Sequence, residues 1–203
     1  MKRLILILSV VIVLAFTADK ETEHFATVEK VADTPVFIFS RPVSEYETVG
    51  KALSFSEMLK LATDQKSNTR EKTAKIVDYA IKRVENGKIS DFDALIIELE
   101  NDKVRAIKFK SAISQKAKIE SYGDLPVYFF CNPDEEYEVV TQLEADYSAR
   151  AAKGGMLFDK IRSMVKRTLK KRDNNEIEYF DAIIINPDDL SEKLIVYKGA
   201  ENK

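Results

Sequence analysis

The chain has 203 residues, enough for one large domain or two small ones. Hydrophobic residues make up 45% and charged residues 33%, a balance typical of globular proteins rather than disordered or fibrous ones. The formal net charge is −2 with both signs interleaved, whereas nucleic-acid binders usually carry a strong basic excess. We therefore expect no nucleic acid among the partners.

The first 18 residues are typical of a secretory signal peptide. Lys2 and Arg3 are followed by an apolar run over 4–15 and by two candidate cleavage sites, Ala15 and Ala18. The run is shorter than the about 20 apolar residues of a membrane-spanning helix, although a retained anchor is the alternative. We expect cleavage and export to the periplasm or beyond, and no lipoprotein, because no cysteine lies near the junction. No transmembrane segment is then expected in the mature chain.

Three sequence blocks occur twice in the same order. PVFIFSRPVSEYETV at 35–49 and PVYFFCNPDEEYEVV at 126–140 are identical at 8 of 15 positions, at an offset of 91. FDALII, which begins at Phe92, corresponds to FDAIII, which begins at Phe180, at an offset of 88. RAIKFK from Arg105 corresponds to KLIVYK from Lys193 at the same offset. This pattern indicates an internal duplication, with a length difference between the second strand and the helix of each copy.

In the first copy, the apolar run 36–39 predicts a buried strand. The next strand begins at Glu45-Tyr46-Glu47, and its alternation slips at Gly50 to the register of Leu53 and Phe55, which predicts a β-bulge. Asn68 and Glu71 form a capping box for a helix that ends at Asn86-Gly87. Two strands, 94–99 and 104–109, complete the copy.

The second copy follows the same order. The run 127–131 predicts a buried strand, and Tyr137, Val139 and Leu143 alternate cleanly with polar residues in the next one. A helix follows Gly154-Gly155, with an inner face made of Leu157, Ile161, Met164, Val165, Thr168 and Leu169. Strands at 182–185 and 194–197 close the copy.

These elements predict an α+β fold of two tandem ββαββ repeats. Each repeat is a mostly antiparallel sheet with one helix on a face, and the two pack as a pseudo-symmetric pair. The expected organisation is a signal peptide (1–18), an N-terminal tail (19–33), repeat 1 (34–110), a linker (111–124) and repeat 2 (125–198).

The order of a strand, a Glu-Tyr-Glu-x-Val-Gly strand, a helix and an Asp-Ala-Ile-Ile strand resembles two small α+β families. One is the YbjQ-type family, which is labelled heavy-metal-binding, and the other is the Rcs stress-sensor outer-membrane lipoprotein. The chain lacks the lipid-attachment cysteine and paired cysteines of the second family, and it has Thr141 where its first copy has Gly50. The resemblance implies a fold and possible oligomerisation, but no functional residue.

The residues available for metal binding are few. The chain has one histidine, His24, and one cysteine, Cys131, far apart in sequence, so a structural zinc site is not expected. Asp134-Glu135-Glu136 lacks the spaced ligands and the glycine of a calcium-binding loop, so we expect a solvated acidic turn there. We expect no metal and no cofactor. We expect Cys131 to be a small buried residue of a strand, with a free reactive thiol or an intermolecular disulfide as the alternative.

Catalytic patterns are also missing from the sequence. A serine or cysteine nucleophile needs a base, and His24 is the only histidine. Asp93 and Asp181 could act as paired carboxylates, but their presence in both copies favours a structural hydrogen-bonding role. Lys153-Gly154-Gly155 reads as a flexible turn rather than an anion-binding loop. We expect no catalytic residues and no enzymatic activity.

The second helix carries a dense positive charge. Its basic residues form a candidate surface for an anionic partner: Lys160, Arg162, Lys166, Arg167, Lys170, Lys171 and Arg172. The alternative is a solvated face whose last cations complement the helix dipole.

The sequence therefore predicts an exported, non-enzymatic envelope protein that binds another protein or assembles with itself through sheet edges. The alternative is a small-ligand or ion-binding protein that uses the cleft between the two repeats.

Overall fold

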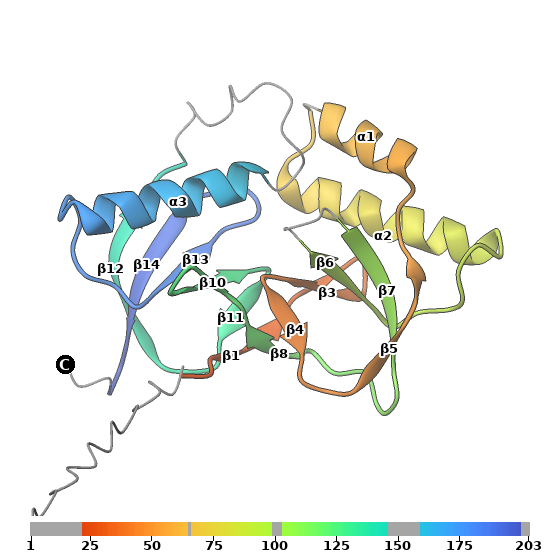
Figure 1. The fold of residues 1–203 in the computed structure, drawn as a ribbon, viewed down its shortest axis with the longest axis horizontal. Coiled ribbons are helices and arrows are strands. Elements are labelled where there is room, and N and C mark those ends of the chain that lie inside the picture. Colours follow the sequence, from red (N-terminus) through yellow and green to blue (C-terminus); the bar gives the residue numbers. More distant parts are fainter. Residues whose placement is uncertain (1–21, 65, 99–102, 146–158, 200–203) are drawn as a thin grey trace, which may run out of the picture.

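The computed structural model describes residues 22–64, 66–98, 103–145 and 159–199. They form a mixed α+β protein with three helices and a larger number of strands, which confirms the predicted fold class. The elements lie in three layers: helices, a large sheet and a small sheet (Figure 1). The predicted signal peptide lies outside the described residues, as do Gly154-Gly155 and Leu157.

The large sheet is continuous across the molecule. Its strand order is β12-β14-β13-β10-β3-β6-β7-β5, with β2 beside β3 and β9 beside β10. The strands are β2 (Lys30–Val31), β3 (Thr34–Ile38), β5 (Tyr46–Lys51), β6 (Ala94–Glu98), β7 (Lys103–Phe109), β9 (Ser121–Tyr122), β10 (Leu125–Phe129), β12 (Tyr137–Leu143), β13 (Ala182–Ile185) and β14 (Glu192–Tyr197). Among the strand pairs of the described residues, β3/β6 and β10/β13 are parallel, and β3 pairs with β10 antiparallel at Ile38 and Phe129.

The small sheet has the order β11-β1-β8-β4, formed by β1 (Phe25–Val28), β4 (Ser40–Pro42), β8 (Lys116–Ile119) and β11 (Cys131–Pro133). Residues 19–33 and 111–124, which we expected to be a tail and a linker, thus contain strands. Their apolar residues alternate over only four positions, as in Ala26 and Val28 of β1, which is too short a pattern to stand out in a polar segment.

The helices are α1 (Phe55–Thr63), α2 (Thr69–Glu85) and α3 (Asp159–Asp173). The predicted capping box of α2 is confirmed, since Asn68 accepts from the Glu71 backbone and Glu71 from that of Asn68. Helix α1 was not expected, and the predicted strand register through Phe55 is wrong. A second capping box, between Ser54 and Glu57, begins a helix there instead.

Both faces of the large sheet are covered. On one face, Val77 of α2 and Val165 of α3 are fully buried against the strands, as the helical periodicity predicts. On the other face, the small sheet encloses a second cluster around Phe37 and Tyr128. Cys131 belongs to this cluster and is 3% exposed, so the predicted burial of the cysteine is confirmed.

Both outer strands of the large sheet are bulged. The bulge predicted at Gly50 is confirmed, because the pairing of β5 with β7 shifts between Thr48 and Gly50. The uninterrupted alternation of apolar and polar residues predicted for β12, at the other edge, is wrong, because the pairing of β12 with β14 shifts between Val139 and Thr141. The shift leaves Val139 48% exposed.

Candidate functional site

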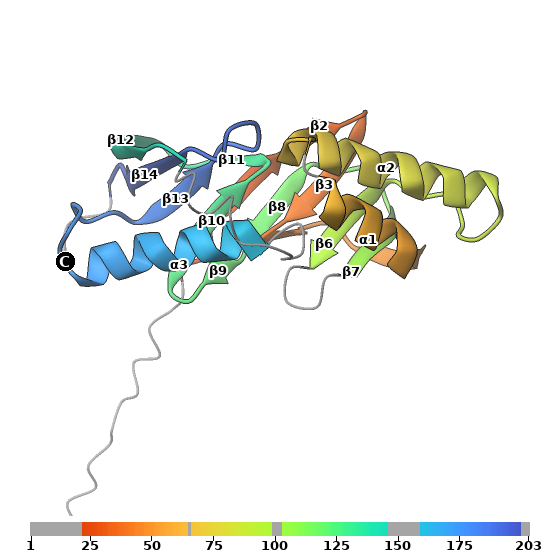
Figure 2. The same ribbon diagram turned by 90° about the horizontal axis from the view of Figure 1, so that it is seen from above.

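The three helices form a basic layer on one face of the large sheet (Figures 1 and 2). Their sequences hold 13 basic and 6 acidic residues, a net charge of +7. The whole chain has a net charge of −2, so the remainder carries −9. Positive charge is therefore concentrated on the side of the molecule that the helices cover, which the near-neutral total does not reveal.

Helix α3 supplies the predicted candidate surface. Lys166, Lys170 and Lys171 are exposed, and none has a carboxylate partner at ion-pair distance among the described residues. Arg162 and Arg172 instead form ion pairs within the protein. Arg162 pairs with Asp159 at 2.6 Å, and Arg172 pairs with Asp124 at 3.1 Å. Arg172 also lies over the ring of Phe180. The three lysines are thus the α3 cations best placed to meet a partner.

Helices α2 and α3 begin near the middle of the molecule and run towards opposite ends (Figure 2). Lys72 in the first turn of α2 and Lys160 in that of α3 repel each other across this junction. Burial, together with the charge of Lys160, lowers the pKa of the Lys72 ammonium. Glu71 and Asp159 lie in the same first turns, so the junction holds both signs of charge.

Helix α1 adds an apolar ridge to the layer. Phe55 is 78% exposed and Leu59 is 56% exposed, and their i, i+4 spacing places them on one face. Lys60 follows directly and is also exposed. Sequence reasoning missed this ridge because it assigned Phe55 to a strand. The Ser54-x-x-Glu57 capping box was the signal that could have found it.

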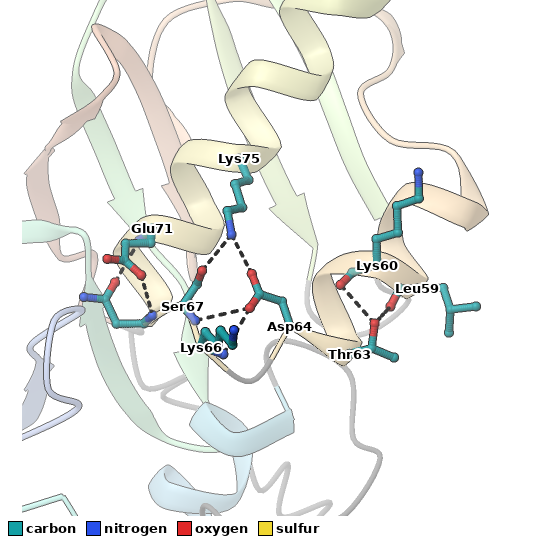
Figure 3. A network of polar contacts seen from close by, with 9 residues as sticks. Leu59, Lys60, Thr63, Asp64, Lys66, Ser67, Glu71 and Lys75 are labelled. Carbon is teal, nitrogen blue, oxygen red and sulfur yellow. Dashed lines mark hydrogen bonds and ion pairs between the residues drawn. The ribbon is translucent and has the colours of Figure 1, made fainter.

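A polar clasp holds α1 against α2 (Figure 3). Lys75 of α2 donates to the Asp64 carboxylate at 2.6 Å and to Ser67 Oγ at 2.7 Å. Asp64 also accepts from the backbone N–H groups of Lys66 and Ser67. The bond from Lys75 comes first among the causes that hold the pKa of Asp64 well below its usual value, so this carboxylate stays ionised.

A cavity of about 570 Å³ is lined by residues of β4, β6, β8 and β9, by the segment before β1 and by Arg162 of α3. Its lining carries both signs of charge, and each charge has a partner: Arg41 pairs with Glu120, Lys118 with Glu23 at 2.7 Å, Glu98 with Arg105 and Arg162 with Asp159. Phe39 and Tyr122, in an edge-to-face contact, supply apolar surface. The cavity is polar and electrically balanced.

His24 lies in a second polar cluster, at the start of β1. Its ring stacks on Tyr197 with centroids 4.7 Å apart, and its Nδ1 is 3.4 Å from Glu135 Oε1. The Tyr197 and Tyr128 hydroxyls are 2.7 Å apart, and burial raises the pKa of both phenols, so they stay protonated. The cluster joins the segment before β1 to β10 and β14.

The other candidate residues have structural partners. Asp93 accepts from the Phe109 backbone and Asp181 from the Tyr197 backbone, so each joins a strand entry to a neighbouring strand. Burial raises the pKa of the Cys131 thiol to about 12, which keeps it unreactive at neutral pH. In the acidic turn, Asp134 pairs with Lys116 at 2.6 Å. Lys153-Gly154-Gly155 lies outside the described residues.

Among the described residues, no group of three or more His, Cys, Asp or Glu side chains is arranged to hold a metal ion. No helix in the described part of the chain is both long enough and apolar enough to cross a membrane. No protein-family model matches the chain, and searches of curated proteins and of solved structures give no significant match.

Proposed function

We propose that this chain is an exported, non-enzymatic interaction module that engages an anionic partner through its helical layer. The observation that carries this proposal is the separation of charge, with +7 in the helices and −9 in the rest of the chain. Such a field steers and orients an anionic partner even when the net charge is close to zero.

The non-enzymatic part of the proposal rests on the chemistry of the available groups. Cys131 is a buried thiol with a raised pKa, and the carboxylates of Asp93 and Asp181 each accept a hydrogen bond from a backbone N–H group. Export rests on the predicted signal peptide over 1–18. Mass spectrometry of the secreted protein tests the cleavage of this segment, and an intact Met1 there would contradict a cleaved signal peptide.

The module consists of two copies of one unit, related as a pseudo-symmetric pair. Outward from the β3/β10 junction, the strand order β6, β7, β5 on one side corresponds to β13, β14, β12 on the other. Phe39 and Phe130 both adopt a positive φ, an uncommon conformation for bulky residues, directly after β3 and β10. Gly87 and Asn175 do so after α2 and α3. An experimental structure in which 34–110 and 125–198 differ in strand order would contradict this reading.

Partner binding is favoured over self-assembly through sheet edges. Both edge strands of the large sheet, β5 and β12, carry a β-bulge. A bulge hinders an exposed edge strand from pairing with a strand of another molecule.

Elution from a heparin column tests the proposal. The triple variant Lys166→Gln, Lys170→Gln, Lys171→Gln should elute at a clearly lower salt concentration than the wild type, because polyanion affinity scales with the number of cations engaged. The matched control is Lys110→Gln, Lys118→Gln, Lys198→Gln, which removes the same charge outside the helices. Equal shifts for the two triple variants would contradict the proposal.

A second candidate function is small-ligand binding in the polar cavity. Its lining contains both signs of charge, in Arg41, Glu98 and Arg162, together with the apolar Phe39, a combination that suits a zwitterionic ligand such as a free amino acid. A thermal-shift screen of the free amino acids tests it. A stabilisation that Arg41→Ala abolishes would support this function, and no stabilisation by any of them would count against it.

A further inference from the structure

We propose that the anionic partner of the helical layer is a lipid bilayer, with Phe55 and Leu59 inserted at headgroup level and the exposed lysines of the helical layer against anionic headgroups. This inference rests on the proposed function and deepens it.

The apolar ridge has the geometry of a membrane-surface contact. Phe55 and Leu59 project from the same helix, α1, which buries Leu61 on its other side. Interfacial helices combine one apolar face with flanking lysines and arginines, whose long stems allow the charge to reach the headgroups. Lys60, the exposed residue directly after Leu59 on α1, supplies such a cation next to the ridge.

The ridge is held in a fixed position. The Ser54–Glu57 capping box fixes the start of α1, and Arg83 of α2 lies 3.8 Å from the Glu57 carboxylate. At the other end, Asp64 is clasped by Lys75, and in Figure 3 Leu59 lies on the side of α1 away from this contact. The two apolar side chains are therefore presented without a large ordering cost on binding.

The size of the ridge favours a bilayer over a protein partner. Two exposed side chains offer far less apolar area than the about 1,000 Å² that a stable protein interface buries. A bilayer needs no matching surface, because each inserted side chain gains its transfer free energy independently. A soluble polyanion would use the lysines and leave Phe55 and Leu59 without a role.

The absence of tryptophan from the chain allows a direct test. Phe55→Trp introduces the single tryptophan of the chain, on the ridge, and its emission can be excited apart from that of the tyrosines. Its emission should shift to the blue and resist acrylamide quenching on addition of vesicles of phosphatidylglycerol and phosphatidylcholine, but not of phosphatidylcholine alone. The control is Val43→Trp, an exposed apolar position beside the small sheet, where no shift is expected.

Vesicle co-sedimentation then separates the ridge from the charge. The variant Phe55→Ser, Leu59→Ser should lose about tenfold in affinity for the anionic vesicles while its heparin elution is unchanged, because removing two inserted apolar side chains affects only the bilayer contact. The control variant Val43→Ser, Ile113→Ser changes two other exposed apolar residues and should bind as the wild type does. Circular dichroism of each variant verifies folding.

The outcomes are distinguishable. Heparin retention without vesicle binding would leave the proposed function intact and overturn the bilayer inference in favour of a soluble anionic partner. Vesicle binding that is unaffected by Phe55→Ser, Leu59→Ser would also overturn it. If the wild type binds neither heparin nor the anionic vesicles, the proposed function itself is overturned.

Discussion

Asp93 and Asp181 make the same hydrogen bond in different parts of the large sheet. Asp93 Oδ2 accepts from the backbone N–H of Phe109 at 2.8 Å, and Asp181 Oδ2 accepts from that of Tyr197 at 2.9 Å. Each aspartate also donates its own backbone N–H to the neighbouring strand, to Ile107 or to Ile195. The side chain and the backbone thus clamp the first residue before β6 and β13 onto the adjacent strand.

Replacing either aspartate by alanine should lower the free energy of unfolding by about 1–3 kcal/mol, because a part-buried N–H then loses a charged acceptor. Urea denaturation of Asp93→Ala and Asp181→Ala measures this loss. Asp91→Ala is the control, since Asp91 is exposed and its contact with Lys108 at 3.6 Å is long. A loss for Asp91→Ala as large as for the other two would contradict the clamp.

The buried carboxyl of Glu192 should make stability depend on pH. Thr168 Oγ1 lies 2.5 Å from Glu192 Oε2, and burial raises the pKa of this carboxyl. A group with a raised folded pKa favours the folded state while protonated, and this contribution is lost as the pH rises through that pKa. The free energy of unfolding of Glu192→Gln, relative to that of the wild type, should therefore increase from pH 4 to pH 8.

Urea denaturation across this pH range provides the measurement for Glu192. The control is Glu178→Gln, which changes an exposed carboxylate and should leave the pH profile unchanged. Parallel profiles for Glu192→Gln and the wild type would show that the carboxyl is not perturbed by burial.

Ser40 and Cys131 begin β4 and β11, and both are buried, at 2% and 3% exposure. The Ser40 hydroxyl has no hydrogen-bond partner in the described part of the protein, whereas a thiol suits the apolar surroundings better. Ser40→Cys should raise the free energy of unfolding by about 1 kcal/mol, and Cys131→Ser should lower it by about 1–3 kcal/mol. Changes of the opposite sign in urea denaturation would contradict this account.

The same burial makes a kinetic prediction for Cys131. Because the thiol is enclosed and its pKa is raised to about 12, labelling by a thiol reagent should be slow in the native protein and fast in urea. Fast native labelling would place the thiol at the surface.

Gly50 allows β5 to approach the segment after α2. A Cβ at this position would lie 2.5 Å from Ile89 Cγ2, so Gly50→Ala should cost about 1–3 kcal/mol through overpacking. The double variant Gly50→Ala, Ile89→Ala should cost less than the sum of the two single changes, since the clash is removed. Strict additivity in thermal or urea unfolding would show that the two residues do not compete for this space.

Local signals in the sequence determined much of the fold. The apolar runs predicted β3 and β10, the Asn68–Glu71 box located α2, and Gly50 predicted the bulge in β5. Each of these signals acts within a few residues through backbone hydrogen bonding, burial or steric freedom. The α3 lysines could likewise be identified as a candidate surface from their spacing alone.

Only the tertiary structure decided which faces are covered and where charge accumulates. Strands β1 and β8 are too short to be recognised, and they form because β11 and β4 provide partners from distant parts of the chain. The exposure of Phe55 and Leu59, and the repulsion between Lys72 and Lys160, likewise depend on how α1, α2 and α3 share one face of the sheet. Such relationships depend on long-range packing, which a local pattern of residues does not specify.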